Sequence, residues 1–577
     1  MILDKVNNTL DLKNLTKEEL KGLSSEIKDI LIKKVSKTGG HFAPNLGVVE
    51  LTIAMHYVFN SPVDKIVYDV SHQCYTHKIL TGRKHGFLDE NKYSEISGYT
   101  TQHESEHDFF IVGHTSTSIS LACGLCEARD IKKEKSNIIA FIGDGSLSGG
   151  LAYEGLNNAS EYGKNLIIVV NDNDMSIGET SGGLYKNLKK LRETKGNCED
   201  NFFKALGLDY VYVDDGHDIE NLIEVFSKVK DIDHPIVVHV KTIKGNGYKY
   251  AEDHKEDFHY VMPFDLETKK SLCPQSKENY ISITNDYLIQ KSKENENIVG
   301  ITAGTPALFD TFRKVRKEKF IDVGIAEEHA ITLSSAMASQ GIKPVVALGS
   351  SFIQRSYDQL SHDLALNNNP AVILIFRSGI SSIDATHIGV FDIPMISNIP
   401  NIVYLCPTTK NEYLKMLDFA INQNERPIVI RVPSDVVEDS IDKEYDFTLN
   451  TFEKIEKGKD VAILGLGSFF GLAKEVCEKL KEDNINSTLI NPRFVSGIDE
   501  SMLEDVSKNH KVVVTLEDGV IDGGFGEKIS RFYSDKNIKV LNYGAKKEFT
   551  DRVSIDELYN RYRLKSDLII DDIKRNL

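Results

Sequence analysis

Two oxygen-bearing residues, Asp144 and Asn173, each follow a short apolar run of the sequence. The runs, Ile138–Ile142 and Leu166–Val170, are rich in β-branched residues and short enough to be buried parallel strands. A stretch of helical length separates them, so the segment predicts strand–helix–strand with both carboxyl ends at one edge of a sheet. One carboxylate together with neutral oxygens suits Mg²⁺ that is shared with a phosphate group. The alternative is that the glycines around Asp144 form only a tight turn between strand and helix.

Other polar residues in the first third of the chain also follow predicted strands. His72 ends a strand that begins near residue 66, and the Gly113-His114-Thr115 triplet ends one that begins near residue 111. Small hydroxyl residues that open a helix are good phosphate contacts. His41 follows two glycines in a loop, where a histidine on its own is more often solvated than reactive. Several such residues at one edge of a sheet predict a shared site.

Composition and charge exclude some classes of partner. The chain has 577 residues, enough for three or four domains, and its composition is that of an ordinary globular protein. A net charge of −17 argues against nucleic acid or an anionic membrane as the main partner. Seven scattered cysteines indicate reduced thiols in a cytoplasmic protein, and we interpret the Cys123/Cys126 pair as core residues of a helix. Neither a signal peptide nor a membrane span is expected.

The elements that position these residues alternate between strand and helix patterns, which predicts an α/β fold of consecutive doubly wound, mostly parallel sheets. Thr16 and Glu19 form a capping box at the start of a helix predicted over residues 16–35. Residues 262–285 are polar and without a clear period, and we expect a linker there. The predicted domains cover residues 1–280, 286–435 and 455–577.

Three blocks carry a resemblance to a known family. They read TGGHFAPNLGVVELTIAMHYVFN, YDVSHQCYTHKILTGR and VGHTSTSISLACGL. These resemble successive blocks of the 1-deoxy-D-xylulose-5-phosphate synthases, relatives of transketolase. The resemblance implies a transketolase-like fold with a diphosphate-binding, a pyrimidine-binding and a C-terminal domain in that order, a homodimer, and a role in isoprene and thiamine biosynthesis.

The resemblance also implies two cofactors, thiamine diphosphate and Mg²⁺. The implied metal ligands are Asp144, Asn173 and the main-chain carbonyl of Met175. The implied cofactor contacts are His72, Gly113, His114, Thr115, Gly145, Ser146, Asn173, Tyr248, Glu327 and Phe352.

Glu327 is the residue with the sharpest implied role. In the family, the matching Glu binds N1′ of the aminopyrimidine ring and drives deprotonation of the thiazolium C2, and Phe352 matches the aromatic residue that stacks on that ring. Such a Glu must be protonated or share a proton, which burial favours. The plainer alternative is a negative charge at a helix N-terminus.

The implied reaction joins a two-carbon unit from pyruvate to D-glyceraldehyde 3-phosphate, with loss of CO₂. The implied catalytic residues are Glu327, His41, His72, His259, His387 and Asp384, and the substrate-binding residues are Arg377, Asp384 and His387. His259 could instead be an ordinary histidine near a domain boundary. Three other functions remain open: ketol transfer as in transketolase, a paralogue that uses another aldehyde, and a binding protein without activity.

The chain departs from the family where the acceptor binds. Gly349 stands where the family has a Tyr, and Ser434 stands where it has an Arg; in the family both help to hold the acceptor phosphate. The loop between Asp384 and His387 is one residue shorter than expected, and the segment before Gly113 is altered. We therefore predict a weak preference for a phosphorylated acceptor.

Overall fold

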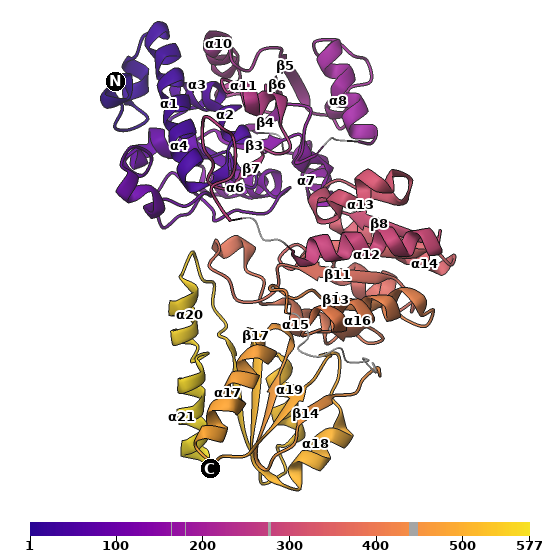
Figure 1. Ribbon diagram of the computed structural model, residues 1–577. Coiled ribbons are helices and arrows are strands. Elements are labelled where there is room, and N and C mark those ends of the chain that lie inside the picture. The colour runs from indigo at the N-terminus through magenta and orange to yellow at the C-terminus, as the bar shows by residue number, and fades with distance from the viewer. Residues whose placement is uncertain (163, 179–180, 275–277, 438–447) are drawn as a thin grey trace. The chain divides into compact units, whose positions relative to one another are not determined.

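The computed structural model describes residues 1–162, 164–178, 181–274, 278–437 and 448–577 (Figure 1). The chain divides into two compact units. Unit 1 comprises Met1–Gln275 with Gly324–Ala326, and unit 2 comprises Ser276–Val323 with Glu327–Leu577. Both units are built from helices around mostly parallel sheets, so the predicted α/β fold class is confirmed.

Unit 1 is organised around one five-stranded parallel sheet in the order β2-β3-β4-β6-β5. The strands are β2 (Lys65–Tyr68), β3 (Ile138–Gly143), β4 (Leu166–Asp172), β5 (Asp209–Val213) and β6 (Pro235–Lys241). All seven residues of β4 are buried, as expected for a central strand covered on both faces. A separate two-stranded antiparallel pair joins β1 (Gly40–His41) to β7 (Tyr260–Val261).

The two faces of this sheet pack on different helices because strand side chains alternate. Ile139 and Phe141 of β3 share a core with α3 and α10, whereas Ile138 and Ala140 share one with α6 and α7. Cys123 and Cys126 are buried in α6, as predicted. The longer helices of unit 1 are α1 (Lys17–Thr38), α3 (Val49–Val58), α6 (Ser118–Lys132), α7 (Gly150–Ala159), α8 (Gly183–Glu193) and α10 (Ile219–Val229), and the shorter ones are α2 (Ala43–Leu46), α4 (Tyr75–Lys78), α5 (His85–Leu88), α9 (Phe202–Ala205) and α11 (Lys249–Asp253).

The predicted capping box of the first helix is confirmed. The Thr16 side chain accepts a hydrogen bond from the Glu19 amide, and the Glu19 side chain accepts one from the Thr16 amide. The predicted linker over residues 262–285 is wrong at its end. Helix α12 (Tyr280–Glu294) begins inside it, capped by Asn279, because Tyr280 and Ile283 pack into the core of unit 2.

Unit 2 contains two further sheets. The first has the order β12-β13-β11-β10-β8-β9 and is parallel throughout. Its strands are β8 (Ile298–Thr302), β9 (Phe320–Asp322), β10 (Lys343–Gly349), β11 (Val372–Phe376), β12 (Val403–Leu405) and β13 (Ile428–Arg431). Besides α12, its helices are α13 (Asp310–Val315), α14 (Glu327–Ser339), α15 (Asp392–Ile396) and α16 (Lys410–Asn422).

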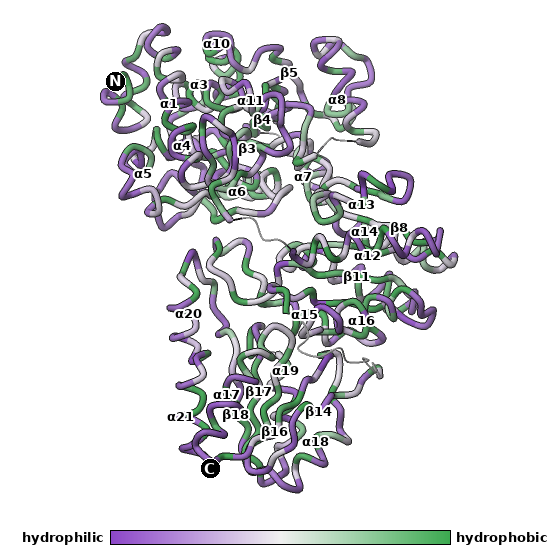
Figure 2. Tube along the Cα trace, in the orientation of Figure 1, coloured by the Kyte–Doolittle hydropathy of each residue, from purple (hydrophilic) through white to green (hydrophobic). Residues whose placement is uncertain are grey.

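The second sheet of unit 2 has the order β14-β16-β15-β17-β18, with β14 the only antiparallel strand among those described in it. Figure 2 shows apolar residues gathered along the strands and hydrophilic ones on the outer helices and turns. The strands are β14 (Glu453–Glu456), β15 (Asp460–Gly465), β16 (Ser487–Asn491), β17 (His510–Val520) and β18 (Lys539–Ala545), and the helices are α17 (Phe470–Glu482), α18 (Glu500–Ser507), α19 (Phe525–Phe532), α20 (Ile555–Arg561) and α21 (Ser566–Asn576). None of the helices described in either unit is long and apolar enough to cross a membrane.

Candidate active site

Asp144 and Asn173 lie at neighbouring strand ends in unit 1. The β3–β4 register pairs Gly143 with Asn171, and the Asp144 amide donates a hydrogen bond of 3.0 Å to the Asn171 carbonyl. The Met175 amide donates to Asp144 Oδ2 at 3.1 Å, so the three proposed metal-binding residues are grouped together. Asn173 Oδ1 is buried without a hydrogen-bond partner among the described residues. A buried oxygen without a donor is the group that a cation would satisfy.

The second carboxylate at this strand end, Asp172, is already paired with protein side chains. Asp172 accepts hydrogen bonds from Arg192 at 2.7 Å and from His239 Nε2 at 2.8 Å. Burial opposes ionisation of Asp172, but the His239 and Arg192 contacts still hold its pKa below the usual value. Burial and the Asp172 charge together raise the pKa of Asp144 well above the usual value. Of these two carboxylates, Asp144 is therefore the one available to bind a cation.

The donor set at these strand ends consists of one carboxylate with neutral oxygens. Across the described parts of the chain, no group of three or more His, Cys, Asp or Glu side chains could hold a metal ion. A set with several thiolates or imidazoles would favour Zn²⁺ or another transition metal, whereas oxygen ligands favour Mg²⁺ bound together with phosphate. The residues present therefore fit Mg²⁺ shared with a diphosphate.

The strand predicted near residue 111 does not form, because residues 111–117 lie in a loop before α6, but the two predicted phosphate-contact loops are joined to each other. Ser116, which follows the Gly113-His114-Thr115 triplet, donates its hydroxyl to the Ser146 carbonyl at 2.8 Å. Asp69, at the end of β2, accepts the Ser116 amide at 2.8 Å and the Ser118 amide at 3.0 Å, which fixes the start of α6. A Cβ at Gly145 would lie 2.7 Å from Ser176 Oγ, so a side chain there would displace the loop.

Three predicted histidines, from segments far apart in the sequence, form one cluster in unit 1. The ring centroids of His41 and His72 are 4.9 Å apart, and the His259 ring lies 5.6 Å from each. The β1–β7 pair aligns His41 with Tyr260, whose ring lies 5.1 Å away, and Tyr99 adds a ring at 5.7 Å.

Both His72 and His259 are neutral at physiological pH. Burial, with a smaller effect of the Lys244 charge, lowers the pKa of His72 to about 3 and that of His259 well below the usual value. The Nδ1 atoms of both rings are buried with no partner among the described residues. Neutral imidazoles with a free nitrogen can accept or donate a proton or bind a substrate hydroxyl.

Asn45 holds the two histidine loops together and was not predicted. Its Nδ2 donates to the His41 carbonyl at 2.8 Å and to the His72 carbonyl at 2.7 Å. Its Oδ1 accepts the Tyr75 amide at 3.0 Å, and the residue is 1% exposed. A buried side-chain amide whose hydrogen bonds all go to backbone groups fixes the spacing of the chain segments around it. The block that contains Asn45 is mostly apolar, so its residue types alone carry no sign of this role.

Lys244 is a second residue that was not predicted. It is 2% exposed, and its Nζ donates to the Ser176 carbonyl at 2.6 Å, next to Met175. Burial lowers its pKa to about 8, although Asp144 opposes the shift. Lys244 belongs to the KGNGY block, from which only Tyr248 was predicted. The Tyr248 hydroxyl is itself buried with no partner among the described residues.

In unit 2, Glu327 is the first residue of α14 and is 4% exposed. Its Oε2 has no hydrogen-bond partner among the described residues, and the nearest cation, Arg355 Nη1, lies 3.6 Å away. Burial raises the pKa of Glu327, and Arg355 only partly offsets this. A carboxyl in this state can hold a proton and donate it to a ring nitrogen. The Phe352 ring lies 5.7 Å from that of His387, at 89°.

Arg377, Asp384 and His387 lie in the loop that connects β11 to α15. Arg377 is exposed and has φ of +58°, a left-handed conformation that costs a non-glycine residue energy and is typical of functional sites. The Gly379 amide donates to the Gly389 carbonyl at 2.7 Å and closes the base of the loop. Asp384 and His387 therefore lie between these two points, near the tip.

The two positions that depart from the family also lie in unit 2. Gly349 ends β10, and a Cβ there would lie 3.1 Å from the Phe352 ring. The Ser434 hydroxyl donates to the Ser378 carbonyl at 3.3 Å, beside Arg377. Both departures thus border residues that were assigned to the cofactor ring or to the acceptor.

Comparison with known proteins defines the class first. Residues 277–438 match the pyrimidine-binding domain of transketolase, and residues 451–569 match the transketolase C-terminal domain. Together with the parallel α/β sheets, these matches make the chain a transketolase-like protein, and this family implies thiamine diphosphate as cofactor. A solved transketolase mutant from Pichia stipitis and a transketolase from Campylobacter jejuni each align with 96% of this chain, and with 97% and 99% of their own, at 16% identity and a TM-score of 0.43.

Residues 3–199 and 191–242 match the family described as 1-deoxy-D-xylulose-5-phosphate synthase. The enzyme of that name from Caldanaerobacter subterraneus subsp. tengcongensis is 40% identical over 99% of this chain and 98% of its own. The one from Clostridium beijerinckii is 40% identical over 98% of this chain and 97% of its own. The chain belongs to the 1-deoxy-D-xylulose-5-phosphate synthase family.

Proposed function

We propose that this protein is a thiamine-diphosphate-dependent transferase that decarboxylates pyruvate and joins the two-carbon unit to D-glyceraldehyde 3-phosphate, giving 1-deoxy-D-xylulose 5-phosphate. The observation that carries the proposal is the buried Glu327 carboxyl, whose Oε2 accepts no hydrogen bond from the described residues. A buried carboxyl oxygen without a hydrogen bond destabilises a fold, so its presence here favours a functional role over a purely structural one. Family membership supports the same reaction.

The residues of unit 1 would hold the metal and the diphosphate. Asp144, Asn173 and the Met175 carbonyl supply oxygen ligands of the kind that Mg²⁺ takes. The loops that carry Gly113, His114 and Thr115, and Gly145 and Ser146, supply backbone amides and hydroxyls at helix starts. When bound, thiamine diphosphate supplies the nucleophilic carbon and the electron sink for decarboxylation.

Glu327 and Phe352 would hold the aminopyrimidine ring. The raised pKa of Glu327 favours the protonated carboxyl, which can donate to the ring nitrogen N1′. The aromatic face of Phe352 suits stacking on a planar ring.

The histidines would move protons on the substrates. His41, His72 and His259 supply imidazoles within 5.6 Å of one another, measured between ring centroids. In unit 2, His387 and Asp384 would bind the acceptor oxygens, and Arg377 would bind its phosphate.

One observation favours an alternative acceptor substrate. Gly349 and Ser434 lack the hydroxyl and the guanidinium that hold the acceptor phosphate in the family, and the exposed Ser434 makes its hydrogen bond to backbone. An unphosphorylated aldehyde is therefore the alternative acceptor, with the same donor chemistry.

The proposal also includes the protein's setting. We propose a homodimer, the usual state in this family, that acts on small molecules without a nucleic-acid or membrane partner. Six of the seven free cysteines are buried, which suits a reducing cytoplasm.

The test is to supply the protein with thiamine diphosphate, Mg²⁺ and pyruvate, together with glyceraldehyde 3-phosphate, glyceraldehyde or a phosphorylated ketose. We expect one CO₂ for each five-carbon product, identified by mass. Glu327→Gln should stop the reaction, and its neighbour Glu328→Gln is the matched control in the same helical turn. Ketol transfer without CO₂ would show transketolase activity instead, and cofactor binding without any turnover would show a binding protein.

A further inference from the structure

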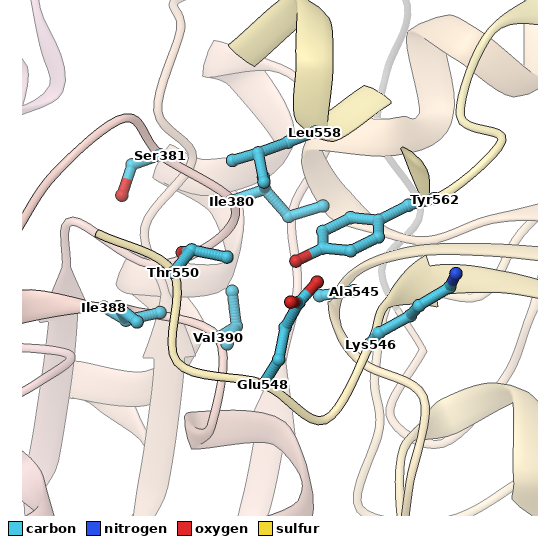
Figure 3. A pocket seen from close by; sticks show the side chains of 10 residues that line it. All are labelled: Ile380, Ser381, Ile388, Val390, Ala545, Lys546, Glu548, Thr550, Leu558 and Tyr562. Atoms are coloured by element: carbon cyan, nitrogen blue, oxygen red, sulfur yellow. The ribbon is translucent and has the colours of Figure 1, made fainter. Parts of the chain in front are cut away.

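The loop at residues 377–389, here called the acceptor loop, packs on the C-terminal part of unit 2. Ile388 and, just after the loop, Val390 are buried in the same core as Leu558 and Tyr562 of the α20 region, and Ile380 packs against that core. Figure 3 shows Ile380, Leu558 and Tyr562 lining one small pocket. The apolar base of the acceptor loop is thus anchored in the core built on β15 and β17, in addition to its covalent link to β11.

The tip of the acceptor loop is held by polar contacts from one short segment. That segment, residues 546–552, connects β18 to α20, and we call it the C-terminal strap. The Arg552 amide donates to the Ile383 carbonyl at 2.9 Å, and the Ala385 amide donates to Asp551 Oδ1 at 3.1 Å. The backbone is therefore fixed on both sides of Asp384.

The strap also faces the Asp384 side chain. Arg552 Nε lies 3.8 Å from Asp384 Oδ1 and 3.5 Å from Asp551 Oδ2. At the first distance the guanidinium attracts the Asp384 carboxylate electrostatically. The Phe549 ring lies 5.8 Å from Phe391, which follows the loop.

From these contacts we propose that the C-terminal strap is a positioning element for the acceptor loop, with Asp551 and Arg552 setting the orientation of Asp384 toward the acceptor aldehyde. The inference rests on the proposed function for the identity of the acceptor. It gives the C-terminal domain a role in substrate selection, because Asp384 is half-exposed and the residues on both sides of it are hydrogen-bonded to the strap. Neither strap residue need touch the substrate.

The test compares four strap variants. Asp551→Ala removes the acceptor of the Ala385 amide, whereas Asp551→Asn keeps an oxygen there. Arg552→Gln removes the charge beside Asp384, whereas Arg552→Lys keeps it. Arg563→Gln is the matched control, because Arg563 follows α20 in the same domain, pairs with Asp572 outside the strap, and is 44% exposed against 33% for Arg552.

We expect Asp551→Ala and Arg552→Gln to raise the acceptor KM about tenfold, the usual scale for one hydrogen bond to a charged group. The pyruvate KM and the cofactor affinity should stay within about twofold of wild type, because other residues are proposed to bind pyruvate and the cofactor. Asp551→Asn and Arg552→Lys should recover most of the acceptor KM. Arg563→Gln should change neither KM.

A readout without turnover separates this proposal from the proposed function. Amide hydrogen exchange of the peptide over residues 380–388 should be faster in Asp551→Ala than in wild type and unchanged in Arg563→Gln. Unchanged amide exchange together with an unchanged acceptor KM in Asp551→Ala would overturn the positioning role proposed for the strap. An equal rise in both KM values would overturn it too, because it would show a general loss of structure. Absence of pyruvate turnover in wild type would overturn the proposed function alone.

Discussion

The histidine cluster of unit 1 and the acceptor loop of unit 2 differ in how their side chains are held in place. In unit 1, His41 and His72 lie on segments that the buried Asn45 ties to each other, within one fold. In unit 2, Asp384 lies on a half-exposed loop, and the residues on both sides of it are hydrogen-bonded to the C-terminal strap. The first arrangement tolerates little change, because any shift breaks buried hydrogen bonds. In the second, the residues proposed to bind the acceptor lie apart in sequence from the histidine segments, and the departures at Gly349 and Ser434 are also in unit 2.

The largest effect is expected at Glu327. Glu327→Gln removes the proton donor for the ring nitrogen but keeps the size of the side chain, so C2–H exchange of bound cofactor should slow by about 10²–10⁴-fold, the usual contribution of a positioned acid or base. Deuterium exchange followed by NMR measures this directly. Glu328→Gln should exchange as wild type does. Exchange at the wild-type rate in Glu327→Gln would remove the role given to Glu327.

Much of the candidate cofactor site could be predicted, because its residues follow patterns that can be seen in short stretches of sequence. Apolar runs that end in Asp144 or His72 predict parallel strand ends, and parallel strands place those ends at one edge. Asn45 and Lys244 could not be predicted from residue type, since their roles come from contacts between distant segments. The strap is harder still, because nothing in residues 546–552 indicates that they contact residues 383–385. The boundaries of the three domains and the site roles stay predictions.

The next effect is expected at the metal site. Among the described residues, Asp144→Ala removes the one carboxylate of this strand end that has no cationic partner, and Asp172 cannot replace it while it is bonded to Arg192 and His239. We expect Mg²⁺-dependent affinity for thiamine diphosphate to fall by about 10²-fold or more. Titration calorimetry with and without Mg²⁺ measures the change. Equal affinity in the mutant and wild type would place the metal elsewhere.

A smaller but more diagnostic effect is expected at Asn45. Asn45→Ala frees the carbonyls of His41 and His72, and a shift of about 1 Å in reacting groups can cost about 10²-fold in kcat. The matched control is Asn285 of α12, which is also 1% exposed, donates to the carbonyls of Ile281 and Leu308, and accepts the Phe312 amide.

The two asparagine variants should differ in activity and agree in stability. Each should lose about 1–3 kcal/mol of unfolding free energy, because each leaves similar backbone groups unpaired. Only Asn45→Ala should lose kcat, measured at saturating substrates, while its Mg²⁺-dependent cofactor affinity stays near that of wild type. Equal losses of kcat in both variants would reduce Asn45 to a residue of general stability.

The smallest effect, and the one that bears most on substrate choice, is expected at Ser434. Ser434→Arg places a guanidinium beside Ser378 and Arg377 on an exposed position, so the fold should tolerate it. Gly349→Tyr is a poorer test, because its Cβ would lie 3.1 Å from the Phe352 ring and would press on the residue assigned to the cofactor. We therefore expect Ser434→Arg alone to raise the ratio of kcat/KM for glyceraldehyde 3-phosphate over glyceraldehyde by about tenfold, the scale of one charge-assisted hydrogen bond. Ser434→Gln, similar in length but uncharged, should raise it less. A wild-type ratio already in the thousands would mean that Arg377 and its neighbours hold the phosphate without the family's Arg and Tyr, and the acceptor would then be the phosphorylated aldehyde of the family.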